Sequence, residues 1–312
     1  MADTFWTADF DVQRGRVRVR TTGADIPFDR ALVGAVVVWL GYYLPVRARA
    51  AWARLTRPGP RIWFTPHRPR PWYLVWAAMA WSGARIARCP KTADAAMFFE
   101  DASLGAAPNS GPAARFNYGC TDVTKSHVAR VFEQVFGYPL AVDPATASGP
   151  VVEKGEANGV HDGRVVEAPC PARSGKTYQR LIDNTAACGR FVDDLRTPCV
   201  GGEPVLVFVK RRPTADRFAN HNTAVSLTTP GAVFSPEEID AIRRFCAAMA
   251  LDWGGLDILR DRIDGRLYVV DVNKTDMGPP IALPLGDKLA ATRLLGDAFL
   301  GLIAGQSDKS AA

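Results

Sequence analysis

The segment from Leu256 to Asn273 constrains the fold of this chain more than any other. Two apolar runs flank an Asp-Gly pair, which is the strongest short-range signal for a β-hairpin. Such a hairpin would place Asp257, Asp271 and Asn273 where three oxygen-bearing side chains can converge. Mg²⁺ prefers oxygen ligands and is usually held by one or two carboxylates together with substrate phosphates. We therefore predict a cation site, and with it an active site, at this hairpin.

Length and composition are those of a globular protein. The 312 residues suffice for two domains or one large one, and 47% are hydrophobic and 22% charged, which excludes a disordered chain. The net charge of +6 favours anionic ligands such as nucleotides, acidic lipids or nucleic acid, but selects none of them. The six cysteines form no Cys-x-x-Cys pair and have no His at zinc spacing, so we interpret them as free thiols. Because the N-terminus also lacks the order of a secretory signal, we expect a cytoplasmic protein.

One apolar run complicates this assignment. Residues 31–46 carry no charge and contain Pro45. Four arginines follow: Arg47, Arg49, Arg54 and Arg57. A spanning helix needs about 17–25 apolar residues, so three alternatives stay open. The run could form a transmembrane helix, or a helix on the membrane surface that would make residues 31–57 a peripheral membrane contact. The third alternative, which we favour, is a buried or domain-packing helix.

The order of breaks and apolar runs predicts an α/β chain with several units. We expect an N-terminal lead with the apolar helix over 1–57, a small α/β domain over 58–115, a second domain over 116–304 and a flexible tail over 305–312. In the small domain, strands at 61–65 and 94–99 flank a helix at 72–87, which favours a parallel sheet. In the second domain we predict helices at 122–136, 236–251 and 287–304, and strands at 150–154, 164–168, 176–182, 204–211, 223–228, 254–260 and 266–272.

Two segments of the second domain could contact phosphates. The strand ending at Lys154 leads into a loop with Gly155 and Gly159, and glycine lets backbone N–H groups approach a phosphate closely. The alternative is a tight hairpin with a surface lysine. The strand that ends at Arg211 and Arg212 could clamp an anion bidentately, or its cations could be solvated.

Other catalytic patterns fail. The Gly175-Lys176-Thr177 sequence is not a P-loop, because Cys170 stands where the motif requires glycine. The sequence has no Gly-x-Ser-x-Gly elbow, His-Glu-x-x-His pair or Cys/His constellation to support a hydrolase or metalloprotease.

Taken in chain order, these segments resemble the ATP-grasp superfamily over roughly residues 116–304. The order runs from a helix with Lys125, through Lys154 and its glycine loop, to Gln179–Asp183, the basic strand end and the hairpin with Asp271 and Asn273. The resemblance implies an α/β (α+β) protein with the ATP-grasp fold and a preceding small α/β, pre-ATP-grasp-like domain.

The resemblance also implies roles at the nucleotide. Lys125 and Lys154 would contact the phosphates of ATP, beneath the loop with Gly155 and Gly159. In the hinge from Gln179 to Asp183, backbone at Leu181 and Ile182 would pair with adenine, and Asp183 would hold ribose.

At the reacting end, Arg211 or Arg212 would face the transferred phosphoryl group. Asp257, Asp271 and Asn273 would hold Mg²⁺, or Mn²⁺ in its place. Two departures stand out: Asp271 is found where the family more often has Glu, and the usual Asp-Lys pair is not adjacent at Lys125.

Enzymes of this kind transfer the γ-phosphoryl group of ATP to a carboxylate, and an amine or another nucleophile then attacks the acyl phosphate. The resemblance therefore implies an ATP-dependent ligase, most often forming carbon–nitrogen bonds, with a small-molecule carboxylate and amine as substrates and no nucleic-acid partner. Two rivals are an ATP-grasp kinase that phosphorylates a hydroxyl and a non-catalytic nucleotide-binding or basic-surface-binding protein. Aromatic residues at Trp63, Trp72, Tyr73 and Trp76 indicate an apolar partner or a packed domain interface, and we favour the interface.

Overall fold

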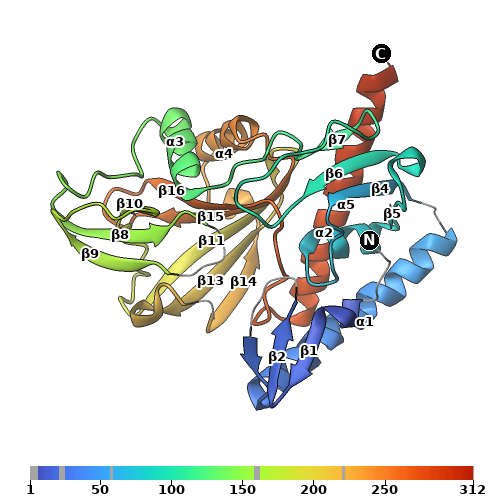
Figure 1. The fold of residues 1–312 in the computed structure, drawn as a ribbon, viewed down its shortest axis with the longest axis horizontal. Coiled ribbons are helices and arrows are strands. Elements are labelled where there is room, and N and C mark those ends of the chain that lie inside the picture. The colour runs from blue at the N-terminus through green and yellow to red at the C-terminus, as the bar shows by residue number, and fades with distance from the viewer. Residues whose placement is uncertain (1–5, 21–24, 57–58, 158–161, 220–221, 312) are drawn as a thin grey trace.

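The computed structural model describes residues 6–20, 25–56, 59–157, 162–219 and 222–311 (Figure 1). At the N-terminus, a 3-10 turn η1 (Trp6–Asp9) precedes a small antiparallel sheet. Its strands are β1 (Phe10–Gln13), β2 (Arg16–Val19) and β3 (Asp25–Pro27), in that order. The helix α1 (Arg30–Thr56) follows and continues through Pro45. The buried residues of α1 all lie from Tyr42 onward, so within residues 31–46 the buried alternative is correct only for Tyr42, Tyr43 and Val46.

Aromatic rings join this N-terminal unit to the rest of the protein. Trp6 contacts Tyr43 of α1 and Trp72, with ring centroids 5.9 and 6.5 Å apart. Trp76 stacks on Tyr43 at 5.7 Å, and Tyr73 meets Phe99 edge to face at 4.9 Å. The interface role predicted for Trp72, Tyr73 and Trp76 is therefore confirmed.

A parallel sheet forms the next unit, as predicted. Its strands are β4 (Arg61–Pro66), β5 (Arg85–Ile86), β6 (Ala95–Phe99) and β7 (Arg115–Phe116), in the order β5-β4-β6-β7, and a 3-10 turn η2 (Pro90–Thr92) precedes β6. The helix α2 (Leu74–Ser82) lies between β4 and β5. It ends earlier than predicted because Gly83 adopts φ 82°, a left-handed conformation that stops the helix.

A three-stranded and a six-stranded antiparallel sheet form the remainder. The helix α3 (Lys125–Phe136) precedes the smaller sheet, which has the order β10-β8-β9. Its strands are β8 (Gly149–Gly155), β9 (Arg164–Ala168) and β10 (Lys176–Arg180). The larger sheet has the order β14-β13-β11-β15-β16, with β12 paired to β11. Its strands are β11 (Phe191–Val200), β12 (Glu203–Pro204), β13 (Val207–Pro213), β14 (Ala224–Thr228), β15 (Trp253–Arg260) and β16 (Leu267–Asn273), with 3-10 turns η3 (Thr214–Asp216) and η4 (Pro230–Ala232).

The hairpin predicted at Leu256–Asn273 is confirmed by β15 and β16. Asp257 lies opposite Asp271, Gly255 lies opposite Asn273, and the register shifts after Asp257. The strand β11 was not predicted, although it is the centre of the sheet. Its two adjacent acids and Pro198 keep the sequence pattern from predicting a strand, since proline and aspartate are depleted in central strands.

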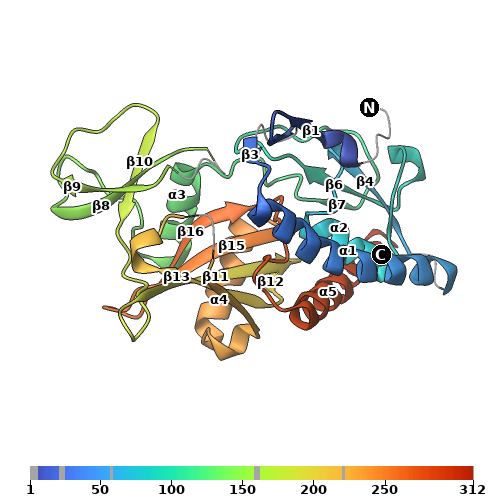
Figure 2. The same cartoon turned by 90° about the horizontal axis from the view of Figure 1, so that it is seen from below.

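Two cores pack against the large sheet (Figures 1 and 2). The first lies between the sheet and the helices α3 and α4 (Pro236–Ala248). The second joins the sheet to α2, the parallel sheet and α5 (Leu285–Ala311), through side chains such as Phe208, Trp253 and Phe299. The helix α5 continues to Ala311, beyond the end at residue 304 predicted for it.

A buried ion pair between Arg196 and Asp276 lies beside Gly255. A methyl group on Gly255 would lie 2.7 Å from Cγ of Asp276 and 2.8 Å from Nε of Arg196, with the Asp276 carboxylate oxygen nearer still. Gly255 therefore leaves the space in which Arg196 and Asp276 meet.

Replacement of Gly255 by alanine should lower the free energy of unfolding by about 1–3 kcal/mol or more, because overpacking displaces the ion pair. Chemical denaturation followed by circular dichroism measures the change. Gly231→Ala is the matched control, since nothing lies within 4 Å of its added Cβ. Equal stability of the two variants would contradict the close packing at Gly255.

Candidate active site

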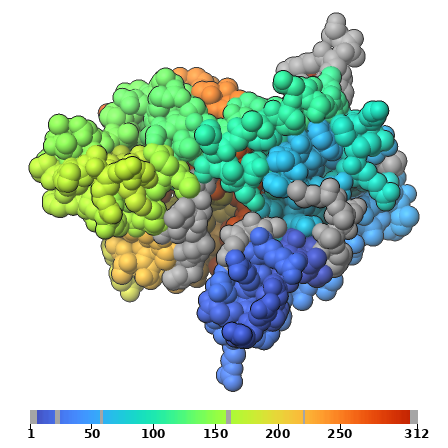
Figure 3. Space-filling view, viewed as in Figure 1, coloured from blue at the N-terminus to red at the C-terminus, as the bar shows by residue number. Residues whose placement is uncertain are grey.

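Charged side chains from the β8–β10 sheet, the six-stranded sheet and α3 line one cleft. The volume of this cleft is about 820 Å³, including solvent at its mouth. Figure 3 shows a hollow between the yellow-green lobe that contains β8–β10 and the blue and cyan N-terminal half. Five cations line the cleft: Lys125, Lys154, Lys210, Arg212 and Arg217. Four carboxylates accompany them: Asp162, Asp194, Asp257 and Asp271.

Strand register places these charges in a row across the large sheet. Asp194 of β11 lies opposite Lys210 of β13, and Arg196 lies opposite Asp257 of β15. Asp257 in turn lies opposite Asp271 of β16. Cross-strand neighbours share one face of a sheet, so these charges gather on one face, where the neighbours have opposite charges except at Asp257 and Asp271, which are both acids.

Arg196 is the centre of the row. It donates to Asp257 Oδ2 at 2.6 Å and pairs with Asp276, whose side chain is only 1% exposed. Lys210 donates to the other Asp257 oxygen at 3.3 Å. Burial alone would raise the pKa of Asp257, but the charges of Arg196 and Lys210 hold it well below its usual range. Asp257 is therefore a carboxylate at neutral pH.

Two lysines meet the sheet at its edge strand β16. Lys125, the first residue of α3, donates from Nζ to Asp271 Oδ1 at 2.5 Å. Lys154 of β8 donates to the carbonyl oxygen of Val270 at 3.2 Å. Burial lowers the pKa of Lys154 to about 8, and the nearby Lys125 adds to the decrease while Asp271 opposes it. The predicted meeting of Lys125, Lys154 and Asp271 is thus found.

The two candidate arginines lie on opposite faces of β13. Arg212 lines the cleft, pairs with Asp194 and donates to the carbonyl oxygen of Ala219 at 2.9 Å. Arg211 lies on the other face, where it contacts both oxygens of Asp193 at 2.7 and 2.6 Å. Because successive side chains of a strand alternate, only Arg212 reaches the cleft, and the proposed role of Arg211 is corrected.

The predicted hinge follows β10 beside the cleft. Gln179 is buried, and its Nε2 has no hydrogen-bond partner among the described residues. The carbonyl oxygen of Ile182 accepts a hydrogen bond from Arg217 Nη2 at 3.2 Å. The carboxylate of Asp183 pairs instead with Arg262 at 2.9 Å, at the tip of the hairpin, so it does not line the cleft. The side chain of Leu181 does not line it either.

The glycine loop is described in part. The backbone N–H of Gly155 donates to Asp162 Oδ1 at 2.9 Å, and Asp162 also pairs with Lys176. The predicted contact through Gly159 lies outside the described residues.

The sequence matches no protein-family profile, and no curated protein matches it. A structure of the ATP-grasp ligase PsnB complexed with a phosphomimetic variant of a minimal precursor, Mg and ADP matches with a TM-score of 0.53 and 13% identity, over 79% of this chain and 99% of that chain. The structure of PsnB complexed with the minimal precursor matches with a TM-score of 0.51 and 13% identity, over 78% and 99%. This chain has the ATP-grasp fold.

The ATP-grasp fold predicted from the sequence is therefore confirmed. The carboxylates of the cleft between the β8–β10 sheet and the six-stranded sheet make it the region to test for a metal. Asp257 and Asp271 face each other across β15 and β16, and Asn273 Nδ2 lies 3.5 Å from Asp257 Oδ2. Two carboxylates and one amide fit Mg²⁺ that is also held by substrate phosphates. The described residues contain no cluster of three or more His, Cys, Asp or Glu side chains placed to hold a metal, so phosphate oxygens would have to complete this set.

Sequence reasoning assigned no role to several charged residues at this cleft. Asp194, which lines the cleft, and Arg196, which pairs with Asp257, belong to the unpredicted strand β11. Lys210 is the cleft-facing neighbour of Arg212 two residues away. The alternation of Lys210, Arg211 and Arg212 along a strand was the available signal, since it separates Arg211 from the other two.

The affinity of the ATP-grasp cleft for ATP should fall as pH rises above about 8. Lys154 is charged below its pKa of about 8 and neutral above it, and bound phosphate stabilises the charged form. Linkage then predicts a loss of about tenfold in affinity per pH unit above that value. Isothermal titration calorimetry with ATP and Mg²⁺ measures it. Lys154→Arg is the control, because arginine stays charged and should abolish this dependence; an unchanged slope would exclude Lys154 as the titrating group.

Arg212→Gln should weaken ATP binding by about tenfold or more, since it removes a charge-assisted hydrogen-bond donor from the cleft. The matched variant Arg211→Gln removes the same charge from the opposite face of β13 and should bind ATP as the wild-type protein does. Calorimetry on both variants, with thermal unfolding to verify the fold, decides the assignment. A larger loss of ATP affinity in Arg211→Gln than in Arg212→Gln would assign the phosphate contact to Arg211.

Proposed function

We propose that this protein is an ATP-dependent ligase that activates a carboxylate as an acyl phosphate for attack by an amine or another nucleophile. The supporting observation is the cleft itself, where Lys125, Lys154 and Arg212 face Asp257 and Asp271. Cations for phosphate oxygens and carboxylates for a divalent cation therefore lie within one cleft. The ATP-grasp fold of the PsnB ligase structures is consistent with this chemistry.

The proposed reaction has two steps. A substrate carboxylate oxygen attacks the γ-phosphorus of ATP, the bond from that phosphorus to the bridging oxygen breaks, and ADP leaves. The nucleophile then attacks the acyl carbon, inorganic phosphate leaves with the bond electrons, and the amine loses its extra proton. Phosphorylation is required because a free carboxylate has oxide as its only leaving group.

The residues of the cleft act by positioning and by charge neutralisation. Lys125 and Lys154 would hold the phosphates, and Arg212 would stabilise charge on the transferred group. Mg²⁺ held by Asp257, Asp271 and Asn273 would neutralise the charge of the phosphate oxygens. Arg196 and Lys210 keep Asp257 ionised and oriented. No protein nucleophile is required.

We further propose that the units before residue 116 help to bind the substrate acid and that the protein acts in the cytoplasm. The parallel sheet shares a core with the large sheet, which keeps it fixed beside the cleft. All six cysteines are free thiols, as expected in a reducing compartment.

The decisive experiment tests pairs of carboxylates and amines for ADP and phosphate release with Mg-ATP. Asp271→Ala and Asn273→Ala should each lower ADP release by about 100-fold or more while the fold is retained, because both residues lie at the end of a strand beside the cleft. Asp240→Ala, which breaks an exposed ion pair on α4, is the matched control and should keep full activity. Full ADP release by Asp271→Ala and Asn273→Ala would exclude the metal assignment.

Hydroxylamine separates the ligase from the rival kinase. An acyl phosphate reacts with hydroxylamine to form a hydroxamate, whereas a phosphorylated hydroxyl does not. Hydroxamate formation that requires ATP and the substrate acid is expected; a stable phosphoester product would establish the kinase.

A further inference from the structure

The outer face of α1 carries an apolar stripe. The helix has the length and composition to span a membrane, and only 17% of its apolar window is buried. Val37, Leu44 and Leu55 are 61%, 60% and 84% exposed. Together with Val33, Leu40, Ala48 and Ala51 they recur every three or four residues, which places them on one side of an α-helix. Figure 2 shows α1 crossing the near face of the molecule.

The opposite face of α1 fixes the helix to the protein. Tyr42, Val46 and Ala50 are buried against Ala77 and Ala80 of α2. The hydroxyl oxygens of Tyr42 and Thr292 of α5 lie 2.7 Å apart in a hydrogen bond. The part of α1 from Tyr42 onward is therefore fixed on the surface of the domain, with its outer side facing outward.

The charge of α1 has one sign. The 27 residues from Arg30 to Thr56 include no Asp or Glu. At 100° per residue, Arg47 and Arg54 flank one side of the apolar stripe and Trp52, which is 63% exposed, flanks the other. Arg49 lies nearer the packed face, where its guanidinium is 5.9 Å from the Trp81 ring. Val36 and Val38, each 45% exposed, lie outside the stripe, so the border of arginine and tryptophan is confined to the C-terminal half of α1. Arginine and tryptophan beside exposed apolar residues are typical of segments at a membrane interface.

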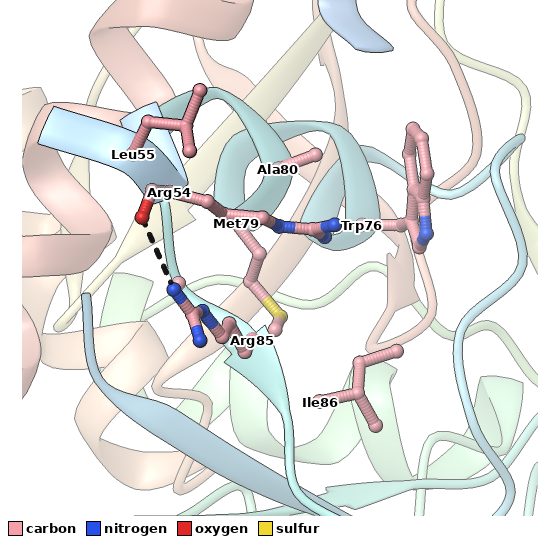
Figure 4. A pocket seen from close by; sticks show the side chains of 8 residues that line it. Arg54, Leu55, Trp76, Met79, Ala80, Arg85 and Ile86 are labelled. Carbon is pink, nitrogen blue, oxygen red and sulfur yellow. Dashed lines mark hydrogen bonds between the residues drawn. The ribbon is translucent and has the colours of Figure 1, made fainter. Parts of the chain in front are cut away.

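A pocket at the C-terminal end of α1 extends this surface (Figure 4). Arg54 and Leu55 of α1 line it with Trp76 and Met79 of α2 and with Arg85 and Ile86 of β5. Arg85 donates to the carbonyl oxygen of Arg54 at 3.3 Å. Neither guanidinium has an ion-pair partner among the described residues. Burial and the neighbouring charges of Arg47 and Arg85 lower the pKa of Arg54, so an anion would relieve repulsion there.

We propose that α1 docks on an anionic lipid surface, with its apolar stripe in the interface and the Arg54–Arg85 pocket receiving a lipid phosphate. Charge complementarity favours an anionic lipid over a second copy of this chain, because α1 offers no acidic residue to pair with the arginines of another α1. The packing of Tyr42 and Val46 favours docking over a spanning helix, because a spanning helix would have to withdraw both residues from their packing against α2.

Vesicle flotation of the full chain tests this proposal without ATP or substrate, so its outcome is independent of the proposed ligase activity. Wild-type protein should float with vesicles of phosphatidylcholine and phosphatidylglycerol in equal parts and not with phosphatidylcholine alone. Added salt should weaken the binding, since counterions screen the arginines. Failure to bind the anionic vesicles would overturn the proposal.

Variants locate the surface. Val37→Asp combined with Leu44→Asp should weaken vesicle binding by at least about tenfold, because acids enter the apolar stripe. Arg54→Gln and Arg85→Gln should each cost about fivefold, which corresponds to about 1 kcal/mol for one basic residue near an anionic surface. Ile263→Asp is the matched control: it adds an acid at an 82% exposed apolar position on the hairpin between β15 and β16 and should bind as the wild type does.

Two outcomes would contradict the proposal. One is an equal loss of vesicle binding in Ile263→Asp and in the α1 variants, which would show that any decrease in net positive charge weakens binding. The other is a wild-type dimer in analytical ultracentrifugation that Leu44→Asp dissociates, which would assign the stripe to a second copy of the chain.

Discussion

The pairing of Arg196 with Asp257 and Asp276 is the interaction on which both the fold and the cleft depend. Its guanidinium joins the central strand β11 to β15 and to the segment that follows β16. That segment also contacts α2, because the backbone N–H of Leu74 donates to the Asp276 carbonyl oxygen at 2.9 Å. Loss of one partner from a buried ion pair costs about 3–5 kcal/mol, since the remaining charge stays desolvated. One side chain thus connects three parts of the chain.

The same pairing explains how a cleft so rich in charge is stable before a ligand binds. Asp257 is neutralised by Arg196 and Lys210, Asp271 by Lys125, and Asp194 by Arg212. Binding of ATP with a divalent cation would exchange partners: phosphates would take the lysines and Arg212, and the cation would take the carboxylates. Such an exchange keeps each charge compensated, which limits the desolvation cost of a buried site.

Much of this arrangement was predictable from the sequence, and the exceptions have physical causes. The hairpin was predicted correctly because an Asp-Gly turn and alternating apolar residues are local signals, and the other strands of the second domain were also found. The strand β11 was missed because its acids and Pro198 are tolerated only through tertiary contacts: Arg211 and Arg212 neutralise the acids, and the Pro198 carbonyl oxygen accepts from Val205 at 3.0 Å. The ribose role of Asp183 failed for a similar reason, because its pairing with Arg262 depends on how the hairpin folds back.

The side chain of Arg217 joins the cleft to the segment that follows β10. It lines the cleft and donates to the Ile182 carbonyl oxygen at 3.2 Å and to Asn184 Oδ1 at 3.1 Å. If the proposed nucleotide pairs with the backbone at Ile182, its base would share that carbonyl oxygen with Arg217, because a carbonyl oxygen has two lone pairs. The free energy of any movement of Arg217 that this sharing requires would be subtracted from the observed affinity. A base without a donor for this oxygen would leave Arg217 in place, so Arg217 would narrow the difference in affinity between bases.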